Sequence, residues 1–113
     1  MSNNSIKEIV WQIVSSIPKG HVASYGQVAA MAGYPSHARF VGSVLKNLPQ
    51  NTTLPWFRVI NAQGKLSFPV DSRNYQRQRL SLKSEGVVFV GQKISLKEYA
   101  WVIKKPLNKS LVK

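Results

Sequence analysis

The sequence contains no cysteine and only two histidines, His21 and His37. Without cysteine the chain has no disulfide bond, no thiolate nucleophile and no cysteine ligand for a metal ion. With so few histidines we expect no zinc site and no cofactor. Acidic residues are also scarce, and the chain has only four of them: Glu8, Asp71, Glu85 and Glu98. This scarcity argues against hydrolysis by a matched pair of carboxylates.

Long apolar segments are missing as well. No apolar run reaches about 18 residues, which predicts no membrane-spanning helix, and no charged-then-apolar leader is present. We therefore expect a cytoplasmic protein that does not act at a membrane. The 113 residues are 43% hydrophobic, which is enough for one domain with its own core. We expect this domain over residues 1–103, followed by a basic, disordered tail over residues 104–113.

Positive charge is the strongest feature of the composition. Sixteen lysines and arginines give the chain a formal net charge of +12 at pH 7. A domain this basic most often binds nucleic acid, because phosphates attract cations whatever the base sequence. A soluble basic protein without such a partner, or one that meets an anionic membrane surface, is the alternative.

Two helices are predicted at the start and in the second half of the chain. Ser5 and Glu8 form a capping box, and apolar residues at helical spacing follow, which predicts a helix over residues 5–17. A strongly basic helix is predicted over residues 72–85, and Gly86 closes it. We interpret the first as scaffold.

Between them the sequence predicts a pair of short helices. Ser24 opens a helix over residues 24–32, and Gly33 ends it in a left-handed conformation. Ser36 is expected to cap the next helix, over about residues 37–47. Two short helices joined by a turn that contains glycine have the outline of a helix-turn-helix motif, although other helical hairpins look similar.

The stretch over residues 54–61 follows the helix pair and sets two aromatic rings after Pro55. Strands are predicted over residues 58–60 and 65–68, joined by a turn over residues 61–64. A hairpin in this place is the wing of a winged helix. Further strands are predicted over residues 87–90 and 94–96, and a last helical turn over residues 97–102. The predicted fold class is mainly α (α+β), a winged helix-turn-helix domain with a small β-hairpin wing.

Five short motifs occur in a fixed order along the chain: Ser24-Tyr25-Gly26-Gln27-Val28-Ala29, Ala38-Arg39-Phe40-Val41-Gly42, Pro55-x-x-Arg58-Val59-Ile60-Asn61, Gly64, and Glu85-Gly86. In this order they resemble the DNA-binding domain of the O6-alkylguanine-DNA alkyltransferases. The resemblance runs from about Ile9 to Trp101, which is nearly the whole chain. It implies a helix-turn-helix protein whose second motif helix enters the minor groove of double-stranded DNA.

The departure from this family concerns its catalytic motif. The enzymes carry Pro-Cys-His-Arg where this chain has Pro55-Trp56-Phe57-Arg58. Their cysteine accepts the alkyl group as a thiolate, activated by the histidine and by a glutamate that Glu85 matches. The indole of Trp56 cannot replace that thiolate, so self-alkylating repair is excluded.

The pattern resembles the alkyltransferase-like proteins, non-enzymatic relatives that commonly have tryptophan at the cysteine position. Many of them keep the histidine, so Phe57 is a further departure. The resemblance implies that the chain binds O6-alkylguanine in double-stranded DNA without repairing it. It also implies that the lesion is handed to nucleotide excision repair, with damage sensors of the UvrA type as partners.

The same resemblance implies nucleotide flipping and assigns residues to it. Arg39 would fill the vacated place in the base stack, and Tyr25 would help to rotate the neighbouring phosphate. The expected DNA-binding residues are Tyr25, Ser36, His37, Ala38, Arg39, Gly42, Lys46, Arg58 and Arg73. The expected lining of the alkylguanine pocket is Tyr25, Leu45, Pro55, Trp56, Val59, Ser67 and Val70. No catalytic or metal-binding residue is expected.

Two other readings of the sequence stay open. A general or sequence-specific winged-helix regulator would read base edges with the helix over residues 37–47, although that helix has few side chains suited to the task. No dimerisation element is visible, so we expect a monomer. A glycosylase would use Asp71 or Glu85, but no histidine or lysine is positioned to work with either.

Overall fold

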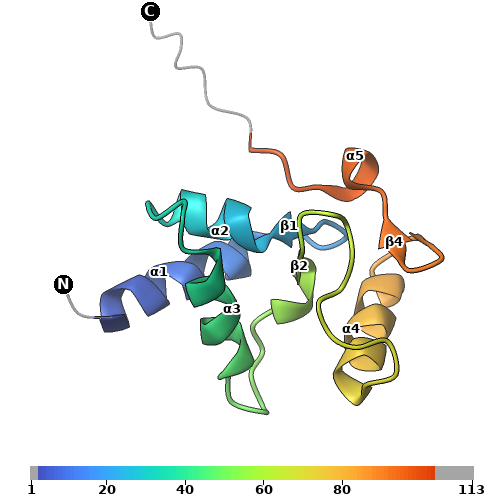
Figure 1. The fold of residues 1–113 in the computed structure, drawn as a ribbon, viewed down its shortest axis with the longest axis horizontal. Coiled ribbons are helices and arrows are strands. Elements are labelled where there is room, and N and C mark those ends of the chain that lie inside the picture. Colours follow the sequence, from blue (N-terminus) through green and yellow to red (C-terminus); the bar gives the residue numbers. More distant parts are fainter. Residues whose placement is uncertain (1–2, 104–113) are drawn as a thin grey trace, which may run out of the picture.

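The computed structural model describes residues 3–103 of the chain (Figure 1). Its elements are α1 (Asn3–Ser16), β1 (Ala23–Ser24), α2 (Tyr25–Met31), α3 (Ala38–Lys46), the 3₁₀ helix η1 (Trp56–Arg58), β2 (Val59–Ile60), α4 (Arg73–Ser84), β3 (Phe89–Val90), β4 (Lys93–Ile94) and α5 (Leu96–Tyr99). The first three helices lie on one side, α4, β4 and α5 lie on the other, and β1 and β2 run between them (Figure 1). The predicted class, helix-dominated with a small hairpin, is confirmed. The predicted tail over residues 104–113 lies outside the described residues.

Two hydrophobic clusters form the core, and the short sheet separates them. β1 and β2 are parallel, with Ala23 opposite Val59. Because side chains alternate along a strand, neighbouring residues face opposite clusters. Ala23 and Val59 belong to the first cluster, whereas Val22 and Ile60 belong to the second. The backbone that leads into β2 is therefore held by apolar packing on both of its faces.

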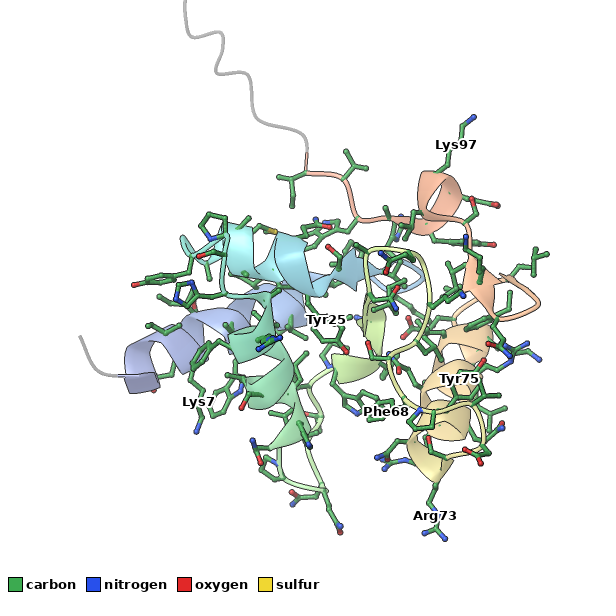
Figure 2. The ribbon with its side chains drawn as sticks, viewed as in Figure 1. Lys7, Tyr25, Phe68, Arg73, Tyr75 and Lys97 are labelled. Atoms are coloured by element: carbon green, nitrogen blue, oxygen red, sulfur yellow. The ribbon has the colours of Figure 1, made fainter. Side chains whose placement is uncertain are left out.

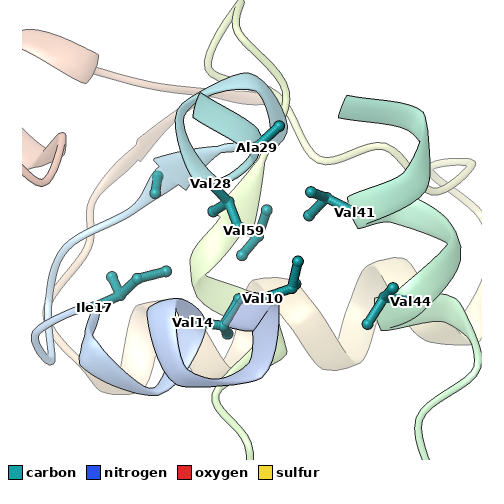
Figure 3. Close-up of a cluster of buried hydrophobic side chains, with 9 residues drawn as sticks. Val10, Val14, Ile17, Val28, Ala29, Val41, Val44 and Val59 are labelled. Carbon is teal, nitrogen blue, oxygen red and sulfur yellow. The ribbon is translucent and has the colours of Figure 1, made fainter. Parts of the chain in front are cut away.

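The first cluster joins α1 to the helix pair (Figure 3). Val10, Val14 and Ile17 recur at helical spacing and are at most 1% exposed. They pack against a buried face contributed by α2 and α3: Val28, Ala29, Val41 and Val44. α1 is thus the scaffold on which the helix pair rests. Its predicted start is wrong, because α1 begins at Asn3 and Ser5 lies inside it.

The helix pair is confirmed, with one correction at its turn. The Ser24 hydroxyl accepts a hydrogen bond from the Gln27 amide at 3.0 Å and caps α2. Gly33 has φ of +93°, the left-handed conformation expected where α2 ends. The predicted cap of α3 by Ser36 is wrong, because the N-cap position belongs to His37. The Ser36 hydroxyl instead lies in a hydrogen bond with Nδ1 of the His37 ring, at 3.2 Å.

The predicted wing is wrong in its pairing. The Asn61 side chain accepts hydrogen bonds from the amides of Gln63 and Lys65, so the predicted turn forms. However, β2 before the turn pairs with β1, and Lys65 after it bridges to Lys93. The hairpin of this fold is β3–β4, which the sequence predicted as two further strands. Burial of both β2 residues against the two clusters outweighs the local preference for a hairpin.

α4 and the segment around α5 complete the described chain. The sequence left the cap of α4 open between Asp71 and Ser72; the Ser72 hydroxyl accepts a hydrogen bond from the Tyr75 amide and is the cap. The backbone N–H of Val22 donates to the carbonyl of Tyr99, and the N–H of Trp101 donates to the carbonyl of Val22. Residues 99–101 thereby extend the small sheet beside β1. Within residues 3–103 no helix is long and apolar enough to cross a membrane.

Candidate nucleic-acid interface

η1 presents the two aromatic rings that follow Pro55. The residues after Pro55 were predicted to leave as a strand from Arg58, but Trp56–Arg58 instead form one 3₁₀ turn. The Arg58 amide donates to the carbonyl of Pro55 at 3.1 Å, and the extended chain begins at Val59. The rings of Trp56 and Phe57 therefore project from consecutive positions of one tight turn.

Trp56 is the centre of an aromatic cluster. Its ring makes T-shaped contacts with the rings of Phe57 and Phe68, at centroid distances of 6.0 and 6.2 Å and interplanar angles of 83° and 89°. The guanidinium of Arg77 lies 5.8 Å from the Trp56 ring centroid. These contacts fix the orientation of the half-buried indole. Phe57 packs against the second core cluster.

α4 holds η1 from behind at two points. Gln78 is 1% exposed, and its Nε2 donates to the carbonyls of Phe57 at 3.1 Å and Val59 at 3.0 Å. Glu85, at the end of α4, accepts from Nε of Arg58 at 3.0 and 3.2 Å and forms an ion pair with Nη2 at 2.5 Å. The backbone and side chains of η1 are therefore held to α4 by the hydrogen bonds of Gln78 and by the ion pair of Glu85.

The carboxylate of Glu85 is held in its charged form. Burial alone would raise its pKa, but hydrogen bonds from Arg58 and from the Gly20 amide, together with the charges of Arg58 and Lys19, outweigh burial and lower the pKa below 4.5. Nη1 of Arg58 also donates to the carbonyl of Ile17 at 2.8 Å. Glu85 thus holds Arg58 and the Gly20 amide in place, and it lines neither of the two cavities described below.

A cavity of about 180 Å³ lies between α3 and α4, in front of Trp56. Seven residues line it: Tyr25, Gly42, Leu45, Lys46, Trp56, Phe68 and Gln78. Tyr25 and Phe68 both lie between α3 and α4 in Figure 2. Gly42 faces the Tyr25 ring, and a Cβ added there would lie 3.9 Å from it. An apolar, aromatic space with few polar groups is typical of a site that encloses a flat organic ligand.

A second cavity of about 290 Å³ adjoins the first. Four residues are common to both cavities: Leu45, Lys46, Trp56 and Phe68. The remaining lining comes from the loop after α3 and from α4: Leu48, Pro49, Gln50, Thr52, Asn74 and Arg77. The space in front of Trp56 therefore continues beyond the indole.

The N-terminus of α3 is an exposed surface of the same helix whose Gly42, Leu45 and Lys46 line the first cavity. Ser36, His37 and Arg39 are exposed, and Ala38 is half-buried. No hydrogen bond from the Arg39 side chain to another part of residues 3–103 is present in the structure. Lys46, at the last turn of α3, is exposed and borders both cavities. Arg73 extends outward from the first turn of α4 (Figure 2).

The structure brings together part of the predicted pocket. Of the residues predicted for the alkylguanine pocket, Tyr25, Leu45 and Trp56 line the first cavity. Val59 does not, because it is 1% exposed within the first core cluster. Pro55, Ser67 and Val70 also stay outside both linings, and Val70 is 48% exposed. The side chain of Arg58, predicted as a DNA-binding residue, is 15% exposed and engaged by Glu85, and its contact with DNA stays a prediction.

Sequence reasoning missed Gln78 and did not single out Phe68. Phe68 lies between Ser67 and Val70, the two residues of this loop that were predicted to line the pocket. Gln78 had a recognisable signal, because it falls between Tyr75 and Leu82 on the buried face of α4. A polar residue at a position that helical spacing assigns to the core usually has a specific hydrogen-bonding task.

These features define a class: a helix-turn-helix domain with an aromatic cavity behind the second helix of the motif. Residues 5–87 match the family model of the 6-O-methylguanine DNA methyltransferase, DNA binding domain. The chain belongs to this family and, within it, is related to the alkyltransferase-like proteins.

Individual relatives agree with this assignment. A DNA base-flipping protein of Vibrio parahaemolyticus is 48% identical over 93 residues, covering 81% of this chain and 91% of that protein. Alkyltransferase-like protein 1 of Schizosaccharomyces pombe is 42% identical over 97 residues, covering 81% of this chain and 90% of that protein. The crystal structure of S. pombe Atl1 in complex with damaged DNA containing O6-carboxymethylguanine matches with a TM-score of 0.83 at 38% identity, covering 91% of this chain and 100% of that chain.

Proposed function

We propose that this protein binds O6-alkylguanine in double-stranded DNA by flipping the damaged nucleotide into the cavity in front of Trp56, without removing the alkyl group. The observation that carries the proposal is the cavity itself. It lies against the helix that would meet the DNA, it is walled by Trp56, Tyr25 and Phe68, and the chain contains no thiol to react. The relatives named for base flipping and the Atl1 complex with damaged DNA support it.

Flipping needs a grip on the backbone and a side chain that replaces the base in the stack. The net charge of +12 supplies the first through phosphate contacts that do not depend on sequence. Arg39 suits the second role, because its guanidinium is exposed at the first turn of α3 and can stack between bases. Tyr25 is the first residue of α2, and its side chain lines the cavity that would receive the flipped base.

The cavity wall explains how an alkylated base is held but left intact. Trp56 offers the alkyl group an apolar surface with no nucleophilic atom. Its indole is held by T-shaped contacts with Phe57 and Phe68, and η1 is held by the hydrogen bonds from Gln78 of α4. A retained lesion must then be removed by other proteins, and we propose nucleotide excision repair, with sensors of the UvrA type, as the system that does so.

The test compares two duplexes that differ only in O6-methylguanine or guanine, titrated at one salt concentration. We expect tighter binding to the methylated duplex, with the methyl group still on the DNA after incubation. Equal binding to both duplexes would leave a general DNA-binding protein, and loss of the methyl group would show that a residue reacts with it.

Arg39→Ala tests the flipping step. We expect it to weaken binding to the methylated duplex by about tenfold, in line with the stacking contribution of one side chain. Lys97→Ala is the control, because it removes the same charge from α5, away from α3 (Figure 2). If both variants lost affinity equally, Arg39 would contribute charge alone.

A further inference from the structure

β4 is the middle of a small sheet on the side of the molecule away from α3. On one side β4 pairs with β3, with Val90 opposite Lys93. On its other side Lys65 bridges to Lys93, and the Ile94 amide donates to the carbonyl of Gly64 at 2.8 Å. Because residues directly opposite each other point to the same face, Lys65, Lys93 and Val90 form one row across three neighbouring segments.

The two faces of this small sheet differ in burial. On the inner face, Leu66 and Ile94 are buried in the second core cluster and Phe89 packs against it. Because successive side chains of a strand alternate between faces, the outer face carries their neighbours: Lys65, Lys93, Val88 and Val90. Val88 is 60% exposed and Val90 is 78% exposed, and both lysines are exposed. The domain therefore leaves two β-branched apolar side chains uncovered on one face of a strand.

Positive charge lies beside these valines without a counter-charge. Lys65 and Lys93 are directly opposite each other, an arrangement of like charges that destabilises a sheet. Among residues 3–103 neither lysine forms a salt bridge. A third cation is fixed to the hairpin, because the Arg79 guanidinium lies 4.3 Å from the Phe89 ring centroid and donates to the carbonyl of Gly91 at 3.0 Å. A partner that presents carboxylates would relieve the repulsion between the two lysines.

β3 is also an edge strand. The Ile94 amide is directed to Gly64, away from β3, so Ile94 and Phe89 form a non-hydrogen-bonded pair of the hairpin. The N–H and C=O of Phe89 then point away from β4. Neither residue of β3 is charged, although edge strands often carry a charge that prevents further pairing. The edge therefore offers a donor and an acceptor to one more extended segment.

We propose that the outer face of the β3–β4 hairpin, together with Lys65, docks an acidic, extended segment of a partner protein that pairs with the edge of β3. Apolar side chains of that segment cover Val88 and Val90, and its carboxylates meet Lys65 and Lys93. A DNA backbone fits this surface less well, because it offers neither apolar side chains nor a strand to add. β4 and α3 lie on different sides of the molecule (Figure 1), so the partner leaves α3 free for DNA. The inference adds a partner to the proposed function and does not depend on a flipped base.

The test selects short random peptides, displayed on phage, for binding to the parent protein. We expect the selected peptides to combine Asp or Glu with β-branched residues, and to shift the amide NMR signals of residues 87–95. The variant Val88→Ser/Val90→Ser is expected to bind them at least about fivefold more weakly, because it removes the apolar surface that they cover. Val102→Ser is the matched control, since Val102 is 73% exposed and lies outside the hairpin, and it is expected to keep the affinity.

Selected peptides that bind the Val88→Ser/Val90→Ser variant as tightly as the parent, or that shift amides of α3 instead, would overturn the inference. A selection without enrichment would overturn it as well, because the hairpin would then dock no such segment.

A second measurement separates a protein partner from DNA. The variant Lys65→Gln/Lys93→Gln is titrated with an unmodified duplex beside Lys7→Gln/Lys97→Gln, which removes the same charge from other exposed positions. We expect equal affinities, because both pairs contribute only to the general attraction of phosphates. A larger loss for Lys65→Gln/Lys93→Gln would make the row of lysines a phosphate contact and overturn the inference. Neither measurement uses a lesion, so the inference and the proposed function can fail separately.

Discussion

Replacing Glu85 with glutamine removes the charge that holds Arg58 under η1. The two side chains are only 8% and 15% exposed, and Arg58 has no other carboxylate partner among residues 3–103. Removing one member of a buried pair typically costs about 3–5 kcal/mol, because the remaining charge stays desolvated. Glutamine keeps one acceptor oxygen, so we expect a loss of about 3 kcal/mol at pH 7.

A loss of this size is easily measured. Folded domains are stable by about 5–15 kcal/mol, and about 3 kcal/mol corresponds to a fall of about 10–20 °C in Tm for a domain of this length. Urea denaturation, followed by tryptophan fluorescence, gives the free energy of unfolding directly. Glu98→Gln is the control, because Glu98 is exposed on α5, and it is expected to stay within about 0.5 kcal/mol of the parent.

The pH dependence gives a second check on the same pair. Folding lowers the pKa of Glu85 below its ordinary value of 4.5. Its contribution is therefore complete above pH 4.5 and is lost as the pH falls through the lower, folded-state pKa. The difference in stability between the parent and Glu85→Gln should narrow over that acidic range. A difference below about 1 kcal/mol at pH 7, or one that does not change with pH, would refute the reasoning.

Three further substitutions test the supports of the site. Gly64→Ala should destabilise the protein by at least about 2 kcal/mol, because φ is +82° and the new Cβ would lie 2.5 Å from the carbonyl oxygen of Ile94; an unchanged Tm would contradict this geometry. Ser72→Ala should cost about 1 kcal/mol in urea denaturation through loss of the α4 cap, and no cost would show that the hydrogen bond is dispensable. Gln78→Leu should cost about 1–2 kcal/mol and weaken discrimination between O6-methylguanine and guanine, because two carbonyls of the cavity floor lose their donor. Retained discrimination would limit Gln78 to a role in stability.

The helix pair could be predicted from sequence because its signals are local. Ser24 caps α2, Gly33 ends it, and apolar spacing marks the faces that pack on α1. The wing could not be predicted in this way. Its turn chemistry at Asn61–Gly64 was read correctly, but the partner of β2 is β1, which is far away in sequence. Strand pairing depends on which buried surfaces meet, and no local pattern encodes that.

The candidate site also combines residues that the sequence identified with one interaction that depends on long-range contacts. Resemblance to a known family assigned Tyr25, Leu45 and Trp56 to an alkylguanine pocket, and in the structure these three residues line one cavity. Arg58 was expected on the DNA surface because its charge was counted without its partner. The partner, Glu85, lies at the far end of α4, so only the folded structure shows that this cation is already used.

The hydrogen bonds of Val22 with Tyr99 and Trp101 have a consequence for how the protein forms during synthesis. The segment that matches the family model ends at residue 87, yet both backbone groups of buried Val22 find their partners beyond it. A nascent chain that has emerged only as far as residue 87 contains every residue of the two cavities but lacks the segment over residues 99–101 that bridges to Val22 beside β1. Because contacts that are distant in sequence form late, we expect the segment beside Val22 to complete its hydrogen bonds only after Trp101 has left the ribosome.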